Sequence, residues 1–233
     1  IIAFLSWQVF RGDIGPDRLE VLKTKNRQKT QISLADGSVV TLNCGSSIEY
    51  SRDFGRNNRE IRLQGEAFFD VVHNGHPFTV LTSNARTTVL GTQFSVRSRQ
   101  NSTRVIVKAG CVRLEARSMK PDLTAEDDVI LTDDQMSEIQ GEAAPGPPSN
   151  VEAGEILGWL EGRLVFHKTP LFEIAGELER AYDAEVSIED PSLTAKTVTA
   201  TFEQLSLETV LGSLCLTLGA DYRLENGVYI LYE

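Results

Sequence analysis

Cysteine and histidine are scarce in this chain of 233 residues, with three of each. Three cysteines are too few for a disulfide framework, and their spacing is not typical of a metal site. The only closely spaced histidines, His73 and His76, lack the nearby Cys or His ligands that zinc requires. We therefore expect no metal and no cofactor. We expect the cysteines to be small buried side chains, and a bridge between Cys44 and Cys111 stays open as an alternative in an oxidising compartment.

Positive charge and aromatic residues are also in short supply. The 23 Lys and Arg against 33 Asp and Glu give a net charge of -10, and Phe, Trp and Tyr make up 7% of the chain. Lys and Arg provide most of the affinity for phosphates and anionic lipids. The composition therefore argues against nucleic-acid binding and against general adhesion to an anionic membrane. With 41% hydrophobic and 24% charged residues, the chain otherwise has the composition of an ordinary soluble protein.

Long apolar runs are missing as well. Residues 1–10 (IIAFLSWQVF) are nearly all apolar, but a helix needs about 20 such residues to cross a bilayer. The composition leaves two interpretations open. This stretch is the end of a transmembrane helix that begins before residue 1, with Trp7 near the membrane interface, or it is the first element of a soluble core.

Signatures of catalysis are absent from the sequence. It contains no G-x-S-x-G nucleophile elbow, no G-x-G-x-x-G run and no phosphate-binding P-loop. Two pairs of adjacent acids, Asp127-Asp128 and Asp133-Asp134, fall in predicted loops. A glycosidase would instead need two carboxylates that face each other across a cleft. We therefore expect that the protein is not an enzyme.

The clearest pattern that is present begins at residue 61. Apolar and polar residues alternate there with a period of two, which predicts a β-strand with one face on a core and a charged face in water. The apolar set is Ile61, Leu63, Ala67, Phe69 and Val71, and the polar set is Arg62, Gln64, Glu66 and Asp70. Gly65 interrupts this strand, which predicts a bulge or a close backbone approach.

Further short strands are predicted on both sides of this stretch. Asp36-Gly37 lies between two alternating apolar runs, which is a strong signal for a β-hairpin. Close turns and the lack of a credible helix before residue 150 predict an all-β unit. The spacing does not decide between a sandwich and a short solenoid-like stack.

The composition changes at residues 141–149, where three prolines and two glycines predict a linker. Two strand–helix–strand units follow it at an offset of about 36 positions. The offset relates Phe166 to Phe202, Leu171 to Leu207, Ile174 to Val210, Leu178 to Leu214, Ala184 to Ala220 and Val186 to Tyr222. Thr169 is the expected N-cap of the first helix, with Pro170 as its first residue. Ser206 is the expected N-cap of the second helix, and Gly219 its end.

Several of these runs resemble one protein family. GEAFFDV, PFTV and VLGTQFSVR, in this order between residues 65 and 97, resemble the periplasmic domain of FecR-type anti-sigma regulators. The resemblance extends upstream to DGSVVTLN at residues 36–43 and downstream to residues 105–107 and 110–112. Ala109 and Asp134 depart from the family pattern without disturbing the strands. The C-terminal repeat is similar to the secretin and TonB short N-terminal fold. The entry to that domain is matched by Trp159, Gly162 and the runs at residues 170–174 and 177–182, which include Glu173, Glu177 and Arg180.

The resemblance implies a domain organisation and a fold class. Residues 1–24 would be the end of a transmembrane helix and a tether, and residues 25–140 the all-β FecR domain. Residues 141–158 would be a linker, and residues 159–233 a duplicated β-α-β domain. The expected fold is therefore mainly β with a smaller α+β domain: an N-terminal sandwich or solenoid-like domain, followed by the duplicated domain.

The resemblance also implies a function. The chain would be the periplasmic sensor part of a single-pass inner-membrane anti-sigma factor, involved in cell-surface signalling and the regulation of iron uptake. It would receive a signal from the periplasmic signalling domain of a TonB-dependent outer-membrane transducer and control an extracytoplasmic-function sigma factor through a cytoplasmic segment. The alternative from another class is a glycan-binding or glycan-active β protein of the cell envelope.

The expected partner-binding residues lie in the closing hairpin of the C-terminal domain. A strand edge offers unpaired N–H and C=O groups to which a partner strand can add. The hairpin is built around Asn226-Gly227. The candidate residues are Tyr222, Leu224, Val228, Tyr229, Ile230 and Leu231.

Overall fold

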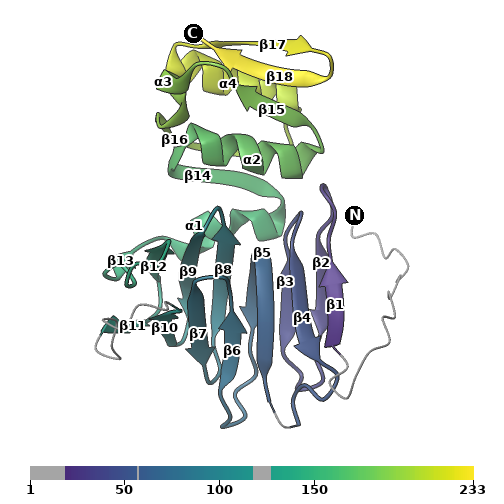
Figure 1. Cartoon of the computed structure of the whole chain (residues 1–233), viewed down its shortest axis with the longest axis vertical. Coiled ribbons are helices and arrows are strands. Elements are labelled where there is room, and N and C mark those ends of the chain that lie inside the picture. Colours follow the sequence, from purple (N-terminus) through teal and green to yellow (C-terminus); the bar gives the residue numbers. More distant parts are fainter. Residues whose placement is uncertain (1–18, 57, 118–126) are drawn as a thin grey trace.

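The computed structural model describes residues 19–56, 58–117 and 127–233 (Figure 1). As the sequence predicts, the fold is mainly β with a smaller α+β domain at the C-terminal end. The apolar stretch at residues 1–10 lies outside the described residues. Among the helices that the structure describes, none combines the length and the apolar character needed to span a bilayer.

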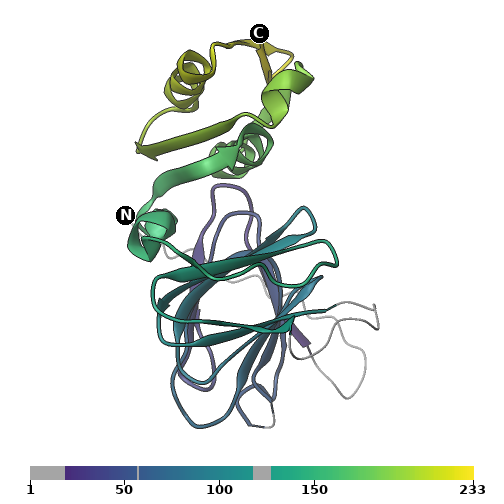
Figure 2. The ribbon, with the colours of Figure 1, turned by 90° about the vertical axis from the view of Figure 1, so that its left-hand side faces the viewer.

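The described part of the N-terminal domain is built on one 13-stranded sheet. This sheet curls so that two layers of strands face each other across a core (Figure 2). The strands are β1 (Leu19–Lys23), β2 (Thr30–Ser33), β3 (Val39–Leu42), β4 (Ser47–Ser51), β5 (Glu60–Asp70), β6 (Phe78–Leu81), β7 (Ala85–Val89), β8 (Gln93–Arg99), β9 (Ser102–Ala109), β10 (Val112–Ala116), β11 (Val129–Leu131), β12 (Gln135–Gln140) and β13 (Ser149–Asn150). Because β1 pairs with β4 along its whole length, the β domain includes residues that the sequence assigned to a tether.

Strand β5 connects the two layers. Its first half pairs with β4 and β6, and its second half pairs with β3 and β8. The change occurs at Gly65, which has φ +96°, and a Cβ there would lie 2.8 Å from the Cα of Ser46. Gly65 is therefore a site of close backbone approach, as the sequence predicts. All five apolar residues of the alternating pattern at residues 61–71 are buried in the same core.

A buried arginine fixes the hairpin that the Asp-Gly pair begins. The Asp36 carboxylate accepts hydrogen bonds from the backbone N–H and the hydroxyl of Ser38, both at 2.9 Å, and from Nε of Arg59 at 2.7 Å. The remaining guanidinium N–H groups of Arg59 donate to the Asn74 side chain and to the carbonyls of Val72 and His76. The side chains of Arg59 and Asp36 are almost fully buried, so this ion pair ties the turns at one end of the domain together.

The predicted linker is anchored to the β domain. Residues 141–148 have no regular structure, but β13, α1 (Ala153–Ile156) and the 3₁₀ helix η2 (Leu157–Glu161) follow within or directly after the segment assigned to a linker. Leu157 and Trp159 are buried against Phe68 and Ile106 in a cluster separate from the main core. Successive side chains of a strand point to opposite faces of the sheet, so Phe68 points away from the main core, in which its neighbour Phe69 is buried. The linker therefore covers the outer face of the sheet.

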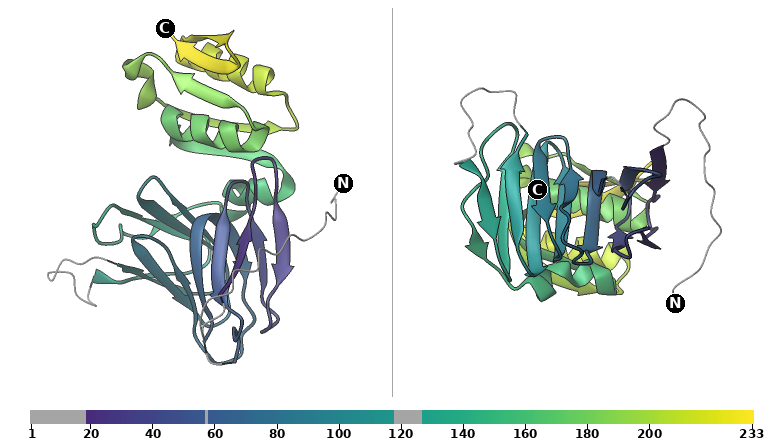
Figure 3. Two further views of the ribbon diagram at one scale, coloured as in Figure 1. Left: turned by 45° about the vertical axis from the view of Figure 1, so that its right-hand side comes forward. Right: turned by 90° about the horizontal axis from the view of Figure 1, so that it is seen from below.

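The C-terminal domain contains the two predicted units. Its elements are β14 (Arg163–Pro170), α2 (Leu171–Tyr182), β15 (Glu185–Ile188), α3 (Pro191–Thr194), β16 (Thr197–Glu203), α4 (Leu207–Leu218), β17 (Asp221–Glu225) and β18 (Val228–Tyr232). Both α2 and α4 have 12 residues, and both end in a left-handed residue, Asp183 and Gly219 respectively. They bury the predicted apolar stripes in one shared core. Figures 1 and 3 show this domain at one end of the β domain.

One predicted helix start is wrong by one residue. The N-cap of α2 is Pro170, which is also the last residue of β14, and the hydroxyl of Thr169 accepts a hydrogen bond from the N–H of His167. Pairing with β16 holds residues 169 and 170 in the strand, so the helix begins later. At the second helix, Ser206 caps the N-terminus as predicted by accepting from the N–H of Thr209 at 3.3 Å.

Candidate functional site

The predicted docking hairpin contains one free strand edge, not two. The three-stranded sheet has the order β15-β18-β17, so β18 is the central strand. It pairs in parallel with β15 from Glu185–Val228 to Ile188–Leu231, and antiparallel with β17. The expectation that Val228, Tyr229, Ile230 and Leu231 offer an unpaired edge is therefore wrong. The local sequence gave no sign of the pairing with β15, which lies about 40 residues earlier.

The free edge belongs to β17, where the other two predicted residues lie. Asn226 and Gly227 both have positive φ and close a two-residue turn. The two residues that flank such a turn, here Glu225 and Val228, form a hydrogen-bonded pair. Because hydrogen-bonded and non-hydrogen-bonded pairs alternate along an antiparallel ladder, the next pair, Leu224 and Tyr229, is non-hydrogen-bonded. The backbone N–H and C=O of Leu224, and by the same alternation those of Tyr222, therefore point away from β18. The Leu224 side chain is 58% exposed.

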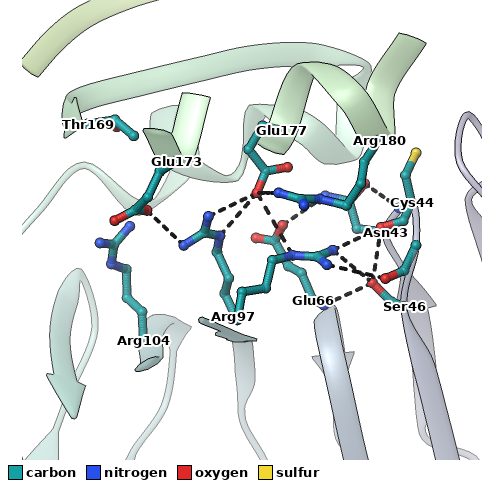
Figure 4. A network of polar contacts seen from close by, with 12 residues as sticks. Asn43, Cys44, Ser46, Glu66, Arg97, Arg104, Thr169, Glu173, Glu177 and Arg180 are labelled. Carbon is teal, nitrogen blue, oxygen red and sulfur yellow. Dashed lines mark hydrogen bonds and ion pairs between the residues drawn. The ribbon is translucent and has the colours of Figure 1, made fainter. Parts of the chain in front are cut away.

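A second candidate site lies where the two domains meet (Figure 4). We call it the interdomain charge cluster. It consists of Glu66, Arg97, Arg99, Glu173, Glu177 and Arg180. The first three project from β5 and β8 of the β domain, and the last three project from α2 of the C-terminal domain.

The contacts in this cluster converge on Glu177. Its Oε1 accepts from both Nε and Nη2 of Arg97, at 3.2 and 3.0 Å. Arg180 Nη2 lies 3.0 Å and Arg99 Nε 3.9 Å from the same oxygen. Nη1 of Arg97 donates to Glu173 at 3.0 Å. A single carboxylate of one domain is thus surrounded by three guanidinium groups, two of them from the other domain.

Glu66 is buried, although the alternating pattern of β5 predicted that its side chain would face water. Its Oε2 accepts a hydrogen bond from the Asn43 side chain at 2.8 Å, and the C-terminal domain covers it. Burial raises the pKa of Glu66, and the neighbouring Glu177 carboxylate raises it further, against the opposing effect of Arg97. Burial also raises the pKa of Glu177. The positive charges of Arg97, Arg180 and Arg99 lower it by more, so the pKa of Glu177 lies below its usual value.

Replacing Glu66 by glutamine should change how stability depends on pH. A carboxyl group whose pKa is higher in the folded than in the unfolded state contributes its full stabilisation below the unfolded-state pKa, which is about 4.3 for Glu. This contribution is lost as pH rises through the folded-state pKa. The charged groups around Glu66 are Arg97, Arg99, Glu177 and Lys29. Urea denaturation between about pH 5 and pH 8 should show the Glu66→Gln variant gaining stability relative to the wild type as pH rises. Parallel profiles would contradict the assignment.

The comparisons with known proteins concern both domains. The family model described as "FecR protein" matches residues 20–113, and the one described as "FecR, C-terminal" matches residues 163–231. The chain belongs to the FecR family of anti-sigma regulators. The FecR match begins within β1, in agreement with the pairing of that strand. Among curated proteins, no match to this chain was found.

Solved structures extend the FecR assignment to nearly the whole chain. Two crystal structures of a proposed anti-sigma factor from Parabacteroides distasonis ATCC 8503 have the same fold. One is 28% identical with a TM-score of 0.82 and covers 91% of this chain and 98% of its own. The other is 29% identical with a TM-score of 0.83 and covers 93% and 99%. The chain therefore has an anti-sigma, FecR-like regulatory role.

The interdomain charge cluster lies across the boundary between the two FecR family regions. Arg97 and Arg99 belong to the FecR match, and Glu173, Glu177 and Arg180 belong to the FecR C-terminal match. Glu173, Glu177 and Arg180 stand in runs that match the family, but the sequence predicted no contact between them and Arg97 or Arg99. The alternation along β8 did indicate that Arg97 and Arg99 lie on the outer face of the sheet, since they have the opposite orientation to the core residue Val96. This alternation does not reveal which other part of the chain covers the outer face.

The cysteines and acids of this FecR-family chain also have defined places. All three cysteines are free thiols; Cys44 and Cys215 are buried as predicted, but Cys111 is exposed. His73 and His76 lie in an exposed turn. Within the described ranges, no three His, Cys, Asp or Glu side chains converge as metal ligands would.

Proposed function

We propose that this chain is the periplasmic sensor part of a single-pass inner-membrane anti-sigma factor. In this proposal its C-terminal domain contacts the periplasmic signalling domain of a TonB-dependent outer-membrane transducer. The contact controls an extracytoplasmic-function sigma factor through a cytoplasmic segment. The FecR family membership supports the regulatory role, and the transducer and the class of sigma factor are inferred from the resemblance of the sequence motifs.

The observation that carries the docking proposal is the free edge of β17. A partner strand can add at Leu224, because its N–H and C=O groups point away from β18. At Tyr222 the C=O points the same way, while the N–H donates to the Asp221 carboxylate at 2.8 Å. The exposed Leu224 side chain adds an apolar contact beside this edge. The β15 edge of the same sheet lies on the far side of β18, so a partner bound at β17 would not contact it.

The proposed role is non-catalytic. The acids of the interdomain charge cluster are engaged by arginines or, for Glu66, by Asn43, which does not leave them free to bind a substrate. The glycan alternative would favour exposed aromatic platforms. In the described part of the chain, the one tryptophan, Trp159 of η2, is buried against the outer face of the sheet, and this supports the signalling role over the glycan alternative.

Replacing Leu224 by proline should weaken transducer binding while the fold is retained. Proline removes an N–H that points outward, and an edge strand tolerates this change because no ladder hydrogen bond is lost. We expect calorimetry with a purified transducer signalling domain to show at least a tenfold loss of affinity, about 1.4 kcal/mol.

The matched control for this test is Leu224→Val. It trims the side chain but keeps the N–H, so it should retain most of the affinity. Circular dichroism of both variants checks the fold. Equal affinity of the proline variant and the wild type would exclude the β17 edge as the docking surface.

A further inference from the structure

We propose that the interdomain charge cluster is a salt-sensitive latch, and that the C-terminal domain moves away from the β domain about Gly162 when this latch opens. The inference rests on the junction alone and does not depend on the identity of a transducer. It assigns to the junction a closed and an open state, and it names the residues that hold the closed one.

The first argument is the polarity of the junction. The core of the β domain and the core of the C-terminal domain are separate clusters that share no residue. Polar contacts join the two domains: Arg97 with Glu173 and Glu177, the N–H of Arg27 with the carbonyl of Arg180 at 2.8 Å, and Asn26 with Asp183 at 3.0 Å. Polar interfaces between domains of one chain permit relative motion unless a large apolar contact prevents it.

The second argument is the incomplete pairing inside the latch. Nε of Arg99 and Nε of Arg180 are buried and have no hydrogen-bond partner. Three guanidinium groups share Glu177, while only Arg97 also reaches Glu173. A buried donor without a partner loses its hydration and gains no bond in return, which disfavours the closed state. Opening lets water reach both Nε groups, so the closed and open states can be close in free energy.

The third argument is the location of the pivot. The linker helix η2 stays with the β domain because Leu157 and Trp159 are buried against the sheet. Gly162 follows η2 directly, has left-handed φ of +86°, and no atom lies within 4 Å of the position of a Cβ there. The next element, β14, already belongs to the C-terminal domain. Rotation at Gly162 therefore separates the domains while the three hydrophobic clusters stay intact, and the local contact that it breaks is the packing of Val165 on β14 against Gly158 of η2.

The chain carries its own reporters of this motion. Cys44 is 7% exposed, and Figure 4 shows its sulfur beside Arg180 under the C-terminal domain. The carbonyl of Cys44 accepts from Arg99 Nη2 at 2.9 Å. Cys215 is buried in the core of the C-terminal domain, and Cys111 is exposed. Cys44 thus reports opening of the latch, Cys215 unfolding of the domain, and Cys111 the maximal reaction rate.

The test is alkylation of the wild-type chain by iodoacetamide, followed by peptide mass spectrometry. Salt screens buried ion pairs weakly, but it acts fully on charges that have reached water. Raising NaCl from about 0.05 M to about 1 M, where the screening length is about 3 Å, therefore favours the open state, in which the charges of the latch are solvated. We expect the reaction rate of Cys44 to rise about tenfold over this range, while the rate of Cys215 stays constant. A Cys44 rate that does not respond to salt, or that rises together with that of Cys215, would overturn the proposal.

A pair of variants checks which charge matters. Glu177→Gln should increase the radius of gyration in small-angle scattering at low salt. The Cys44 rate does not decide for this variant, because the Glu177 carboxylate also raises the pKa of the Cys44 thiol, and its removal favours the reactive thiolate without any opening. Glu185→Gln on β15 removes the same charge from an exposed site outside the cluster and should keep the radius of gyration of the wild type. Equal radii of gyration in both variants would refute the role of Glu177. If Glu177→Gln fails to fold, the salt series on the wild type decides.

Discussion

Replacing Arg59 by alanine is expected to lower the free energy of unfolding of the β domain by about 3–5 kcal/mol, the usual cost of breaking a buried ion pair on one side. The substitution leaves the Asp36 carboxylate without its charged partner in a site that is almost closed to water. It also removes the donors to the carbonyls of Val72 and His76, so two further acceptors lose their partner, while Asn74 Oδ1 keeps the backbone N–H of His76. Urea denaturation of the wild type and the variant measures the difference.

A nearby arginine serves as the control for this experiment. Arg62 on β5 has an exposed side chain that does not take part in this buried network, and Arg62→Ala should change the stability by no more than about 0.5 kcal/mol. A loss of less than about 1 kcal/mol in Arg59→Ala would show that the buried pair does not hold the turns together.

Replacing Gly65 by alanine should have an effect of similar size for a different reason. Its φ of +96° is unfavourable for any side chain, and the new Cβ would lie 2.8 Å from the backbone Cα of Ser46. Left-handed strain contributes about 1–2 kcal/mol, and overpacking against an atom that cannot turn away contributes about 1–3 kcal/mol. Thermal or urea denaturation should therefore show a loss of about 2–5 kcal/mol, and β5 cannot pass between the layers without distortion.

Gly75→Ala separates the two contributions. Gly75 also has positive φ, +81°, but no atom lies within 4 Å of the position of its Cβ. This variant should lose only the part due to strain, about 1–2 kcal/mol. Equal losses for the two variants would mean that the close approach of Ser46 to Gly65 has no energetic consequence.

Much of the fold could be predicted because its signals are local and periodic. The alternation at residues 61–71 identified the core side of β5, and the prediction was confirmed at every apolar position. The offset between the two C-terminal units was confirmed by α2 and α4, which start at residues 171 and 207. Hairpins at Asp36-Gly37 and Asn226-Gly227 could be predicted because glycine accepts the positive φ that these turns require.

The errors share a physical cause, which is the packing of segments far apart in the chain. Parity placed Glu66 on the outer face of β5, but the C-terminal domain covers that face and buries the carboxylate. In the same way, β15 adds to β18 in parallel and occupies an edge that the local pattern left free. The pairing of β1 with β4 and the burial of Leu157 and Trp159 after the linker could not be predicted for a related reason, since both depend on partners elsewhere in the chain.

Amide hydrogen exchange of this chain, with and without a transducer signalling domain, tests the central proposal most directly. The proposal predicts slower exchange at the outward N–H of Leu224 and at its neighbours in β17 when the partner is present, with the β11 edge of the other domain unchanged. Protection confined to the β domain, or no protection at any concentration of the partner, would contradict it.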